Sequence, residues 1–276
     1  MRRLTLPLVI LGCIALAAFL TWIAVSSSFG RRAPASDPRA PRPPVTTVTQ
    51  ALPSFHKLDV SGSADVTLVQ GDRESVALPS GAREDGMVTA EVRDGTLYIE
   101  SRNQARWWDL VFGGNDGEAP IVVTFRQLDD IAVAGTVKIT AAKLRAETLR
   151  VAGAGGTSLR IDDLDARDLK VSGAGALRAD VAGKAADATI TISGAGEFRG
   201  GKLVTQNAAV TVAGAGKVTV NAEKTLKATI SGAGSVDYTG DPKVTESVSG
   251  AGRVRKRDAS ASRTQLVGFS EWARAL

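Results

Sequence analysis

The sequence predicts an all-β protein: a right-handed parallel β-helix, or solenoid, with about 18–21 residues per coil, preceded by a strand-rich lead-in. Two observations lead to this fold class. A five-residue phrase, Val-Ser-Gly-Ala-Gly or a near copy, occurs six times between Val151 and Gly252. Apolar residues alternate with polar ones on either side of each copy, which is typical of strands with one buried face.

The spacing of the copies indicates stacked repeats. They begin at Val151, Val171, Ile192, Val212, Ile230 and Val248, which is a nearly constant period. The intervals contain no helical pattern long enough for a crossover helix, so each strand can be buried only by pairing in parallel with its counterpart one repeat later. The chirality of parallel strand connections makes the expected coil right-handed.

The glycines of the phrase are the candidate structural residues. They are Gly153, Gly155, Gly173, Gly175, Gly194, Gly196, Gly214, Gly216, Gly232, Gly234, Gly250 and Gly252. We expect them to sit where the chain bends or approaches a neighbouring strand, because glycine tolerates positive φ and carries no Cβ.

Weaker signals extend the pattern towards the N-terminus. Val60–Val66 resembles a degenerate early copy, and Val133-Ala134-Gly135 is a partial copy that lies one period before Val151. Asp94-Gly95 stands between two alternating runs, as expected of a two-residue hairpin turn.

These features divide the chain into five parts. They are a membrane anchor or signal segment (1–25), a Pro/Arg/Ser-rich linker (26–44), a strand-rich lead-in with N-terminal coils (45–130), the Gly-Ala-Gly repeat solenoid (131–257) and a tail or C-terminal cap (258–276). The cap is suggested by Phe269, Trp272 and Leu276, which fall on one face of a helix.

The N-terminal segment predicts export. Leu4–Val25 is a nearly charge-free run, long enough for a spanning helix, whereas the apolar part of a signal peptide has about 7–15 residues. Length favours an uncleaved anchor, although Ala24-Val25-Ser26 is a plausible cleavage site and Cys13 lies in a sequence that resembles a lipoprotein box. Each reading places the protein in the cell envelope, and the anchor places the solenoid in the periplasm, held to the inner membrane.

Composition excludes several functions. The formal net charge of +5 hides an acidic body, because residues 45–252 contain 22 Lys and Arg against 26 Asp and Glu. Such a body is not expected to bind nucleic acid. With Cys13 the only cysteine and His56 the only histidine, no disulfide, cysteine-based zinc site or histidine cluster can form, and we expect no cofactor or metal.

Catalytic motifs are also lacking. A dinucleotide fingerprint occurs once between a strand and a helix, whereas this Gly-Ala-Gly phrase recurs. Asp162, Asp163, Asp165 and Asp168 lack the period of a calcium β-roll and indicate a solvated turn. Aligned by the phrase, the next position reads Gly156, Ala176, Glu197, Lys217, Ser235 and Arg253, which is no column of carboxylates. We therefore expect no enzyme.

One aromatic cluster is a candidate contact patch. Trp107, Trp108 and Phe112 lie in a glycine-rich loop, where exposed aromatics would mark an interaction site for a glycan, a peptide or protein, or a lipid surface. The alternative is that the loop folds over the solenoid wall and covers its apolar surface.

The repeated phrase, its period and the lead-in strands resemble the bacterial "putative auto-transporter adhesin, head GIN domain" family over roughly residues 50–255. The resemblance implies an envelope-located β-solenoid and assigns it no activity. The favoured hypothesis is a non-enzymatic envelope protein that presents a surface for binding or adhesion. The alternatives are a carbohydrate-active β-helix enzyme and a structural or stress-associated envelope component.

Overall fold

The computed structural model describes residues 47–79, 88–102 and 120–257, all within the unit Val45–Leu276. Every regular element in these ranges is a β-strand, which confirms the all-β prediction. Within the same ranges there is no helix with the length and hydropathy needed to cross a membrane. The predicted anchor, the aromatic cluster at 107–112 and the predicted cap at 258–276 lie outside the described residues.

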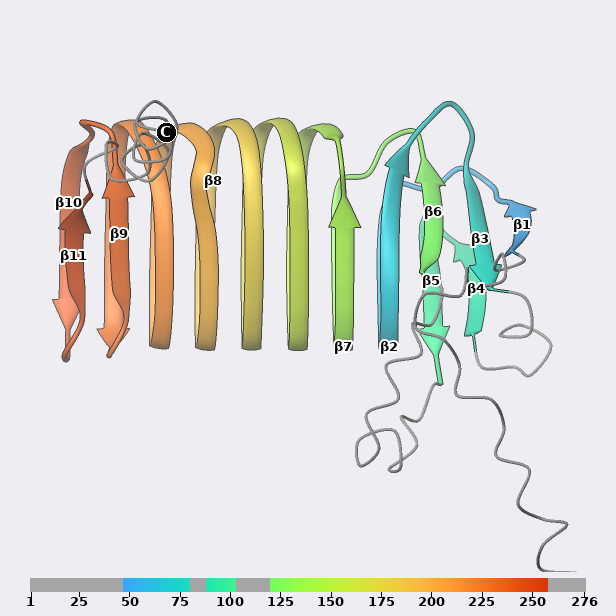
Figure 1. The fold of residues 1–276 in the computed structure, drawn as a ribbon, viewed down its shortest axis with the longest axis horizontal. Helices are drawn as coiled ribbons and strands as arrows, with labels where there is room; N and C mark the ends of the chain where they lie inside the picture. Colours follow the sequence, from blue (N-terminus) through green and yellow to red (C-terminus); the bar gives the residue numbers. More distant parts are fainter. Residues whose placement is uncertain (1–46, 80–87, 103–119, 258–276) are drawn as a thin grey trace, which may run out of the picture. The chain divides into compact units, whose positions relative to one another are not determined.

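Eleven strands form one sheet (Figure 1). They are β1 (Thr47–Ala51), β2 (Lys57–Gln70), β3 (Ser75–Pro79), β4 (Val88–Arg93), β5 (Thr96–Ser101), β6 (Ile121–Phe125), β7 (Asp130–Ala141), β8 (Leu144–Gly232), β9 (Ser235–Thr239), β10 (Lys243–Ser249) and β11 (Arg253–Lys256). The pairing order β1-β3-β6-β2-β7-β8-β9-β11 has two ends, so this sheet is not closed.

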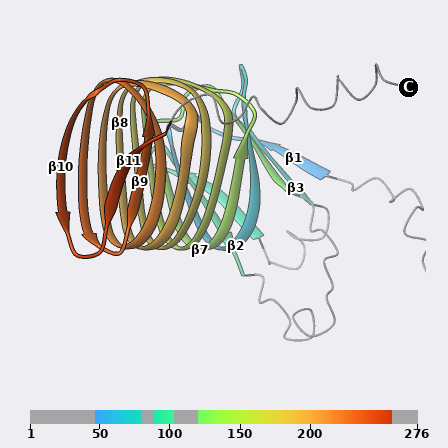
Figure 2. The same ribbon diagram turned by 60° about the vertical axis from the view of Figure 1, so that its left-hand side comes forward.

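Parallel pairing at the repeat spacing dominates the sheet. β7 pairs in parallel with β8, with Ile131 opposite Val151, and β10 pairs in parallel with the end of β8, with Val248 opposite Ile230. In between, β8 continues without a break for 89 residues, and Figure 2 shows its ribbon passing round several times beside itself. The repeats are therefore neighbours in space, as the sequence period predicts.

A column of glycines with positive φ runs through the repeats. It comprises Gly62, Gly135, Gly155, Gly175, Gly194, Gly214, Gly232 and Gly250, hereafter the column glycines. From Gly155 to Gly250 a Cβ on each would lie 2.5–2.7 Å from the carbonyl oxygen of the preceding column glycine. Glycine is required here both by the backbone conformation and by the close stacking of backbone on backbone.

The spatial register of the repeats differs from the register of the phrase. In the first two copies the column glycine is the second Gly of the phrase (Gly155, Gly175), whereas from the third copy on it is the first (Gly194). The partial copy at 133–135 is also offset by two residues from the phrase that follows it. Its first residue, Val133, pairs with Gly153, the third residue of that phrase, and Gly135 pairs with Gly155. A shift of two residues keeps every side chain on its face of the strand, so the buried pattern survives it.

Large and small residues change places at this shift. In the repeat of Gly175, the small residue Gly173 comes two positions before the column glycine and the large residue Leu177 comes two positions after it. In the next repeat, around Gly194, the large residue Ile192 comes before the column glycine and the small residue Gly196 comes after it. A Cβ on Gly173 would lie 2.7 Å from Leu177 Cδ2, and one on Gly196 would lie 2.9 Å from Ile192 Cγ2. One large side chain therefore fills the shared space in each repeat.

The core follows the inward face of the strands. It consists mainly of Val, Ile, Leu and Ala side chains at alternate positions, with Phe125 and Phe198 fully buried. The alternation is visible in β7, where Val137, Ile139 and Ala141 are buried and Lys138 is exposed. Burial of these layers of aliphatic side chains supplies the main stabilisation.

The lead-in strands enter the sheet out of chain order. Residues 57–62 of β2 pair in parallel with β5, and residues 66–70 pair in parallel with β6. The other edge of β2 pairs with β7, placing Gly62 opposite Gly135, so the segment Val60–Val66 lies in register with the partial copy at 133–135. β4 and β5 form the predicted hairpin, in which Asp94 and Gly95 have φ of 50° and 70°.

Candidate functional site: a charged groove

Polar and charged residues at equivalent positions of successive repeats form a column. Five residues after each column glycine from Gly135 on, the residues are Thr140, Arg160, Asp180, Arg199, Thr219, Asp237 and Arg255. Strand pairing places Thr140 opposite Arg160, Thr219 opposite Asp237 and Asp237 opposite Arg255. The pairing of Asp237 with Arg255 brings opposite charges together across neighbouring repeats, as favourable cross-strand pairs do.

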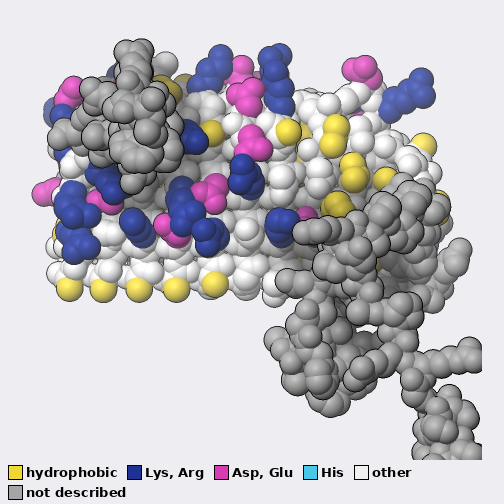
Figure 3. All heavy atoms as spheres, viewed as in Figure 1, with side chains coloured by type: hydrophobic (Ala, Val, Ile, Leu, Met, Phe, Trp, Pro, Cys, Tyr) yellow, Lys and Arg dark blue, Asp and Glu magenta, His cyan; other side chains and the backbone are white. Residues whose placement is uncertain are grey.

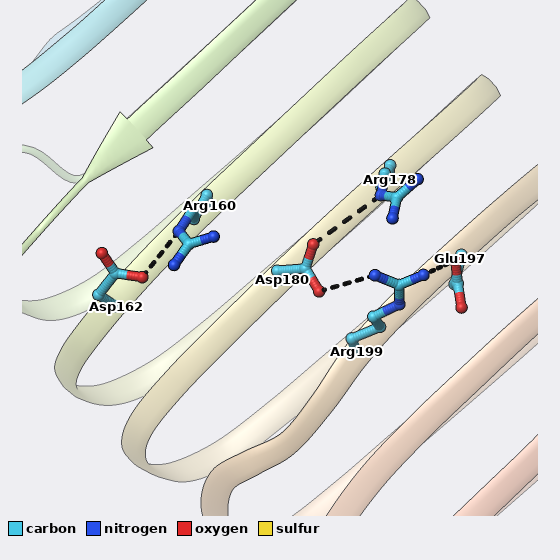
Figure 4. A network of polar contacts seen from close by, with 6 residues as sticks. All are labelled: Arg160, Asp162, Arg178, Asp180, Glu197 and Arg199. Atoms are coloured by element: carbon cyan, nitrogen blue, oxygen red, sulfur yellow. Dashed lines mark hydrogen bonds and ion pairs between the residues drawn. The ribbon is translucent and has the colours of Figure 1, made fainter.

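Arg199 is the centre of the ionic network drawn in Figure 4. One of its guanidinium nitrogens lies 2.7 Å from Glu197 Oε2, and another lies 3.6 Å from Asp180 Oδ1 in the preceding repeat. Asp180 Oδ2 in turn lies 4.0 Å from Arg178 Nε. These exposed contacts add little stability individually, but they hold Arg199 in one position between two carboxylates.

Arg160 is held separately, within its own repeat. Its Nε donates a hydrogen bond of 2.9 Å to Asp162 Oδ1. The side chains of Arg160 and Asp162 are both largely exposed, so their polar groups remain available to a ligand from solvent.

The network lies in a groove of 960 Å³ along this wall. Its charged lining residues are Lys138, Arg160, Asp162, Arg178, Asp180, Glu197, Arg199, Lys202, Lys217 and Arg257. Basic and acidic side chains gather in this band over β8 in Figure 3. The basic residues outnumber the acidic ones by seven to three in this described lining, so the groove has the opposite sign to the acidic body of the chain.

Ion pairing keeps the Glu197 carboxylate charged. The hydrogen bond from Arg199 lowers the pKa of Glu197, and the charges of Arg199, Arg178 and Lys217 lower it further against an opposing effect of burial. Contact with Glu197 correspondingly raises the pKa of Arg199. Glu197 is therefore an ionised hydrogen-bond acceptor at neutral pH and not a proton donor.

A buried carboxylate lies near the C-terminal end of the same wall. Asp237 is 1% exposed, and its Oδ1 accepts a hydrogen bond of 3.2 Å from Arg255 Nε. Its Oδ2 has no hydrogen-bond partner among the described residues and lies 3.9 Å from Arg257 Nε. Arg255 and Arg257 therefore supply the positive charge that this buried anion requires.

Asp59 is a second unusual carboxylate, away from the groove. It lies in β2 between Tyr98 of β5 and Ala132 of β7, and it forms no hydrogen bond or ion pair with a described residue. Partial burial raises the pKa of Asp59, and the nearby charge of Glu100 raises it further.

The structure separates the twelve phrase glycines into two classes. Gly155, Gly175, Gly194, Gly214, Gly232 and Gly250 belong to the positive-φ column. Gly153, Gly173, Gly196, Gly216, Gly234 and Gly252 lie two residues away on either side. A Cβ at each of these would meet a side chain at 2.5–3.0 Å, for example Thr157 at Gly153 and Val212 at Gly216. Glycine is required in the first class by the backbone conformation and in the second class by the packing of neighbouring side chains.

The acidic run at 162–168 does not gather around one point. Its members contact basic side chains: Asp163 lies 4.0 Å from Lys143, Asp165 lies 3.3 Å from Lys184 and Asp168 lies 2.9 Å from Arg167. Among the described residues, no group of three or more His, Cys, Asp and Glu side chains could hold a metal ion.

The phrase alignment concealed the charged columns. It set Glu197 beside Ala176, whereas the spatial register sets Glu197 beside Arg178, three residues after Gly175. The signal that could have revealed the columns is the alternation in charge of Arg160, Asp180 and Arg199, which recur at close to the repeat spacing.

Sequence comparison connects this architecture to a known family. The family described as "Putative auto-transporter adhesin, head GIN domain" matches residues 54–242, more than half of the chain. The chain belongs to this family. Its matched region contains the column glycines from Gly62 to Gly232 and most of the groove. No curated protein shows significant similarity to the chain.

Solved structures of bacterial proteins share the fold of this head GIN domain protein. A "putative adhesin" from Bacteroides fragilis aligns with a TM-score of 0.67 at 21% identity, over 78% of this chain and 96% of that one. A "putative adhesin" from Parabacteroides merdae has a TM-score of 0.58 at 17% identity, covering 77% and 96%. A "putative lipid binding protein" from Parabacteroides distasonis has a TM-score of 0.55 at 21% identity, with the same coverage.

Proposed function

We propose that this head GIN domain protein is a non-enzymatic protein of the cell envelope that presents a repeat-built surface for binding or adhesion. The observation that carries the proposal is the exposed charged groove, whose side chains come from consecutive repeats and are held in place by ion pairs. Membership of a family described as adhesin-like, and structural neighbours described as adhesins, support the same conclusion.

The surface is a wall of a right-handed parallel β-helix in this proposal. Three observations support the β-helix: the parallel pairing of β7 with β8, the stacking of the column glycines, and the repeated passage of the β8 ribbon in Figure 2. With one repeat per coil, outward side chains at equivalent positions lie about 4.8 Å apart. A ligand could therefore contact several repeats through similar groups.

The proposed location is outside the cytoplasm. The adhesin-like family supports an extracellular or envelope location. The finer placement is an inner-membrane anchor formed by Leu4–Val25 with the repeats in the periplasm. N-terminal sequencing of the mature protein tests it: a chain that still contains residues 4–25 supports the anchor, whereas a chain that begins after Val25 or at a lipidated Cys13 contradicts it.

The binding function is tested with the purified full-length protein on a glycan array and in a pull-down from envelope extracts. Saturable binding that is abolished by charge reversal in the groove supports the proposal. Turnover of a polysaccharide, lost in Glu197→Gln, would instead favour a carbohydrate-active enzyme. Concentration-dependent self-association without any ligand would favour a structural envelope component.

A further inference from the structure

The groove contains two cations outside its ion pairs. Lys202 and Lys217 are exposed lining residues and form no ion pair with a described residue. Lys217 lies in β8 opposite Ser235 of β9, and Glu197 stands at the equivalent position of the preceding repeat, where it forms its ion pair with Arg199. These two ammonium groups can therefore bind an anion without first breaking a salt bridge.

The arginines of the groove offer fixed donors beside these lysines. Arg178 and Arg199 are 59% and 44% exposed, although each approaches a carboxylate. A guanidinium has five N–H donors, so one or two contacts leave others directed to solvent. Arginine binds a planar carboxylate through two parallel hydrogen bonds, which favours carboxylate-bearing ligands over isolated point anions.

Carboxylates and hydroxyls stand between the cations. Asp162, Asp180 and Glu197 accept hydrogen bonds, and Ser158 and Thr219 can both donate and accept them. A mixed lining of this kind suits a ligand that carries many hydroxyl groups as well as negative charges. Repeats about 4.8 Å apart present these groups at intervals similar to the length of one sugar ring in an extended chain.

The same lining disfavours other polyanions. The apolar lining residues Leu159, Ile161 and Val181 are buried, so the described part of the groove has no exposed large apolar side chain to insert between lipids. Its described lining also contains no aromatic residue on which the bases of a single-stranded nucleic acid could stack.

We propose that the groove binds an acidic polysaccharide, with Lys202, Lys217, Arg178 and Arg199 contacting its carboxylates and the groove carboxylates and hydroxyls contacting its sugar hydroxyls. This inference rests on the proposed binding function and names the class of ligand. The positive groove directs such a chain to this wall, because the other residues of the range 45–252 are net negative and repel it.

The test uses the full-length protein and polygalacturonate oligosaccharides, with the fully methyl-esterified oligosaccharide as the neutral match. Calorimetry should detect binding of the acid form, weakened by added salt, and little binding of the ester. Lys202→Glu with Lys217→Glu should raise the Kd by about tenfold or more. The milder pair Lys202→Gln and Lys217→Gln should weaken binding in the same direction.

The matched control reverses two lysines elsewhere on the protein. Lys170 and Lys227 are exposed but line no part of the groove, so Lys170→Glu with Lys227→Glu makes the same change in net charge. Retained binding in this control supports the inference. Equal losses in the two pairs would overturn it, because they would indicate a response to net charge alone.

Two further arms separate the competing ligands. Binding to phosphatidylglycerol vesicles, or to a thymidine oligonucleotide, without binding to polygalacturonate would overturn the inference in favour of a lipid or a nucleic acid. A ligand found on the array whose binding does not depend on Lys202 and Lys217 would also overturn it, while the proposed binding function would stand.

Discussion

Replacing Gly155 with alanine should destabilise the protein strongly, whereas the same change at the adjacent Gly156 should not. Gly155 has φ of +101°, and a Cβ there would lie 2.5 Å from the carbonyl oxygen of Gly135. Positive φ at a non-glycine residue costs about 1–3 kcal/mol. Relieving the overlap requires β7 and β8 to separate, which adds a cost of about 1–3 kcal/mol typical of overpacking.

At Gly156 neither penalty applies. Its φ is not in the left-handed region, and the nearest atom to an added Cβ is Thr136 Oγ1 at 3.6 Å, an ordinary contact. Alanine restricts the unfolded chain, so Gly156→Ala should be neutral or stabilise by about 0.4–1 kcal/mol.

Thermal unfolding followed by circular dichroism distinguishes the two variants. A loss of about 3–5 kcal/mol in Gly155→Ala corresponds to a fall in Tm of roughly 10 °C for a domain of this size, while Gly156→Ala should melt at or slightly above the wild-type temperature. Similar Tm values for the two variants would refute the assignment of Gly155 to a backbone-stacked column.

Further predictions concern packing and charge. Ile192→Gly should destabilise by about 2–5 kcal/mol through the cavity that it leaves, and Gly196→Leu by about 1–3 kcal/mol through overpacking. The double variant should recover at least half of the summed loss in urea unfolding, because it restores the arrangement of the preceding repeat; strictly additive losses would contradict this. Arg255→Ala should cost about 1–3 kcal/mol by leaving the buried Asp237 carboxylate with less compensation, and an unchanged urea midpoint would rule that out. Asp59→Asn should stabilise by less than about 1 kcal/mol at neutral pH, since the folded-state pKa is raised and ionisation opposes folding above it. That gain should disappear in Tm measurements as the pH falls below the unfolded value near 3.8, where Asp59 is protonated in both states; a gain that persists there would contradict the ionic explanation.

The glycine phrase and the alternation of apolar residues were sufficient to predict the strands, the parallel neighbours and the Asp94-Gly95 hairpin. They were not sufficient to predict the register. A shift of two residues between Gly175 and Gly194 leaves the inside-outside pattern unchanged, so hydrophobicity carries no signal of it. The large residue follows the column glycine in one repeat (Leu177) and precedes it in the next (Ile192), and this change can be recognised only when the column glycines are known.

The candidate site was hidden for the same reason. Charged residues such as Asp180 and Arg199 lie a full repeat apart in the sequence, and only the spatial register makes them neighbours. The position of β2 could not be predicted either, because the local pattern of a strand does not indicate which later segments pair with its two edges.

The placement of β2 sets an order of events for folding. Lys57 pairs with Thr96 on one edge and with Asp130 on the other, whereas each repeat within β8 needs only the repeat before it. Contacts between segments close in sequence form sooner than distant ones. During synthesis from the N-terminus, β2 therefore cannot complete its pairing until β7 has been made. Folding should begin with pairing between neighbouring repeats and end with the pairing of β2.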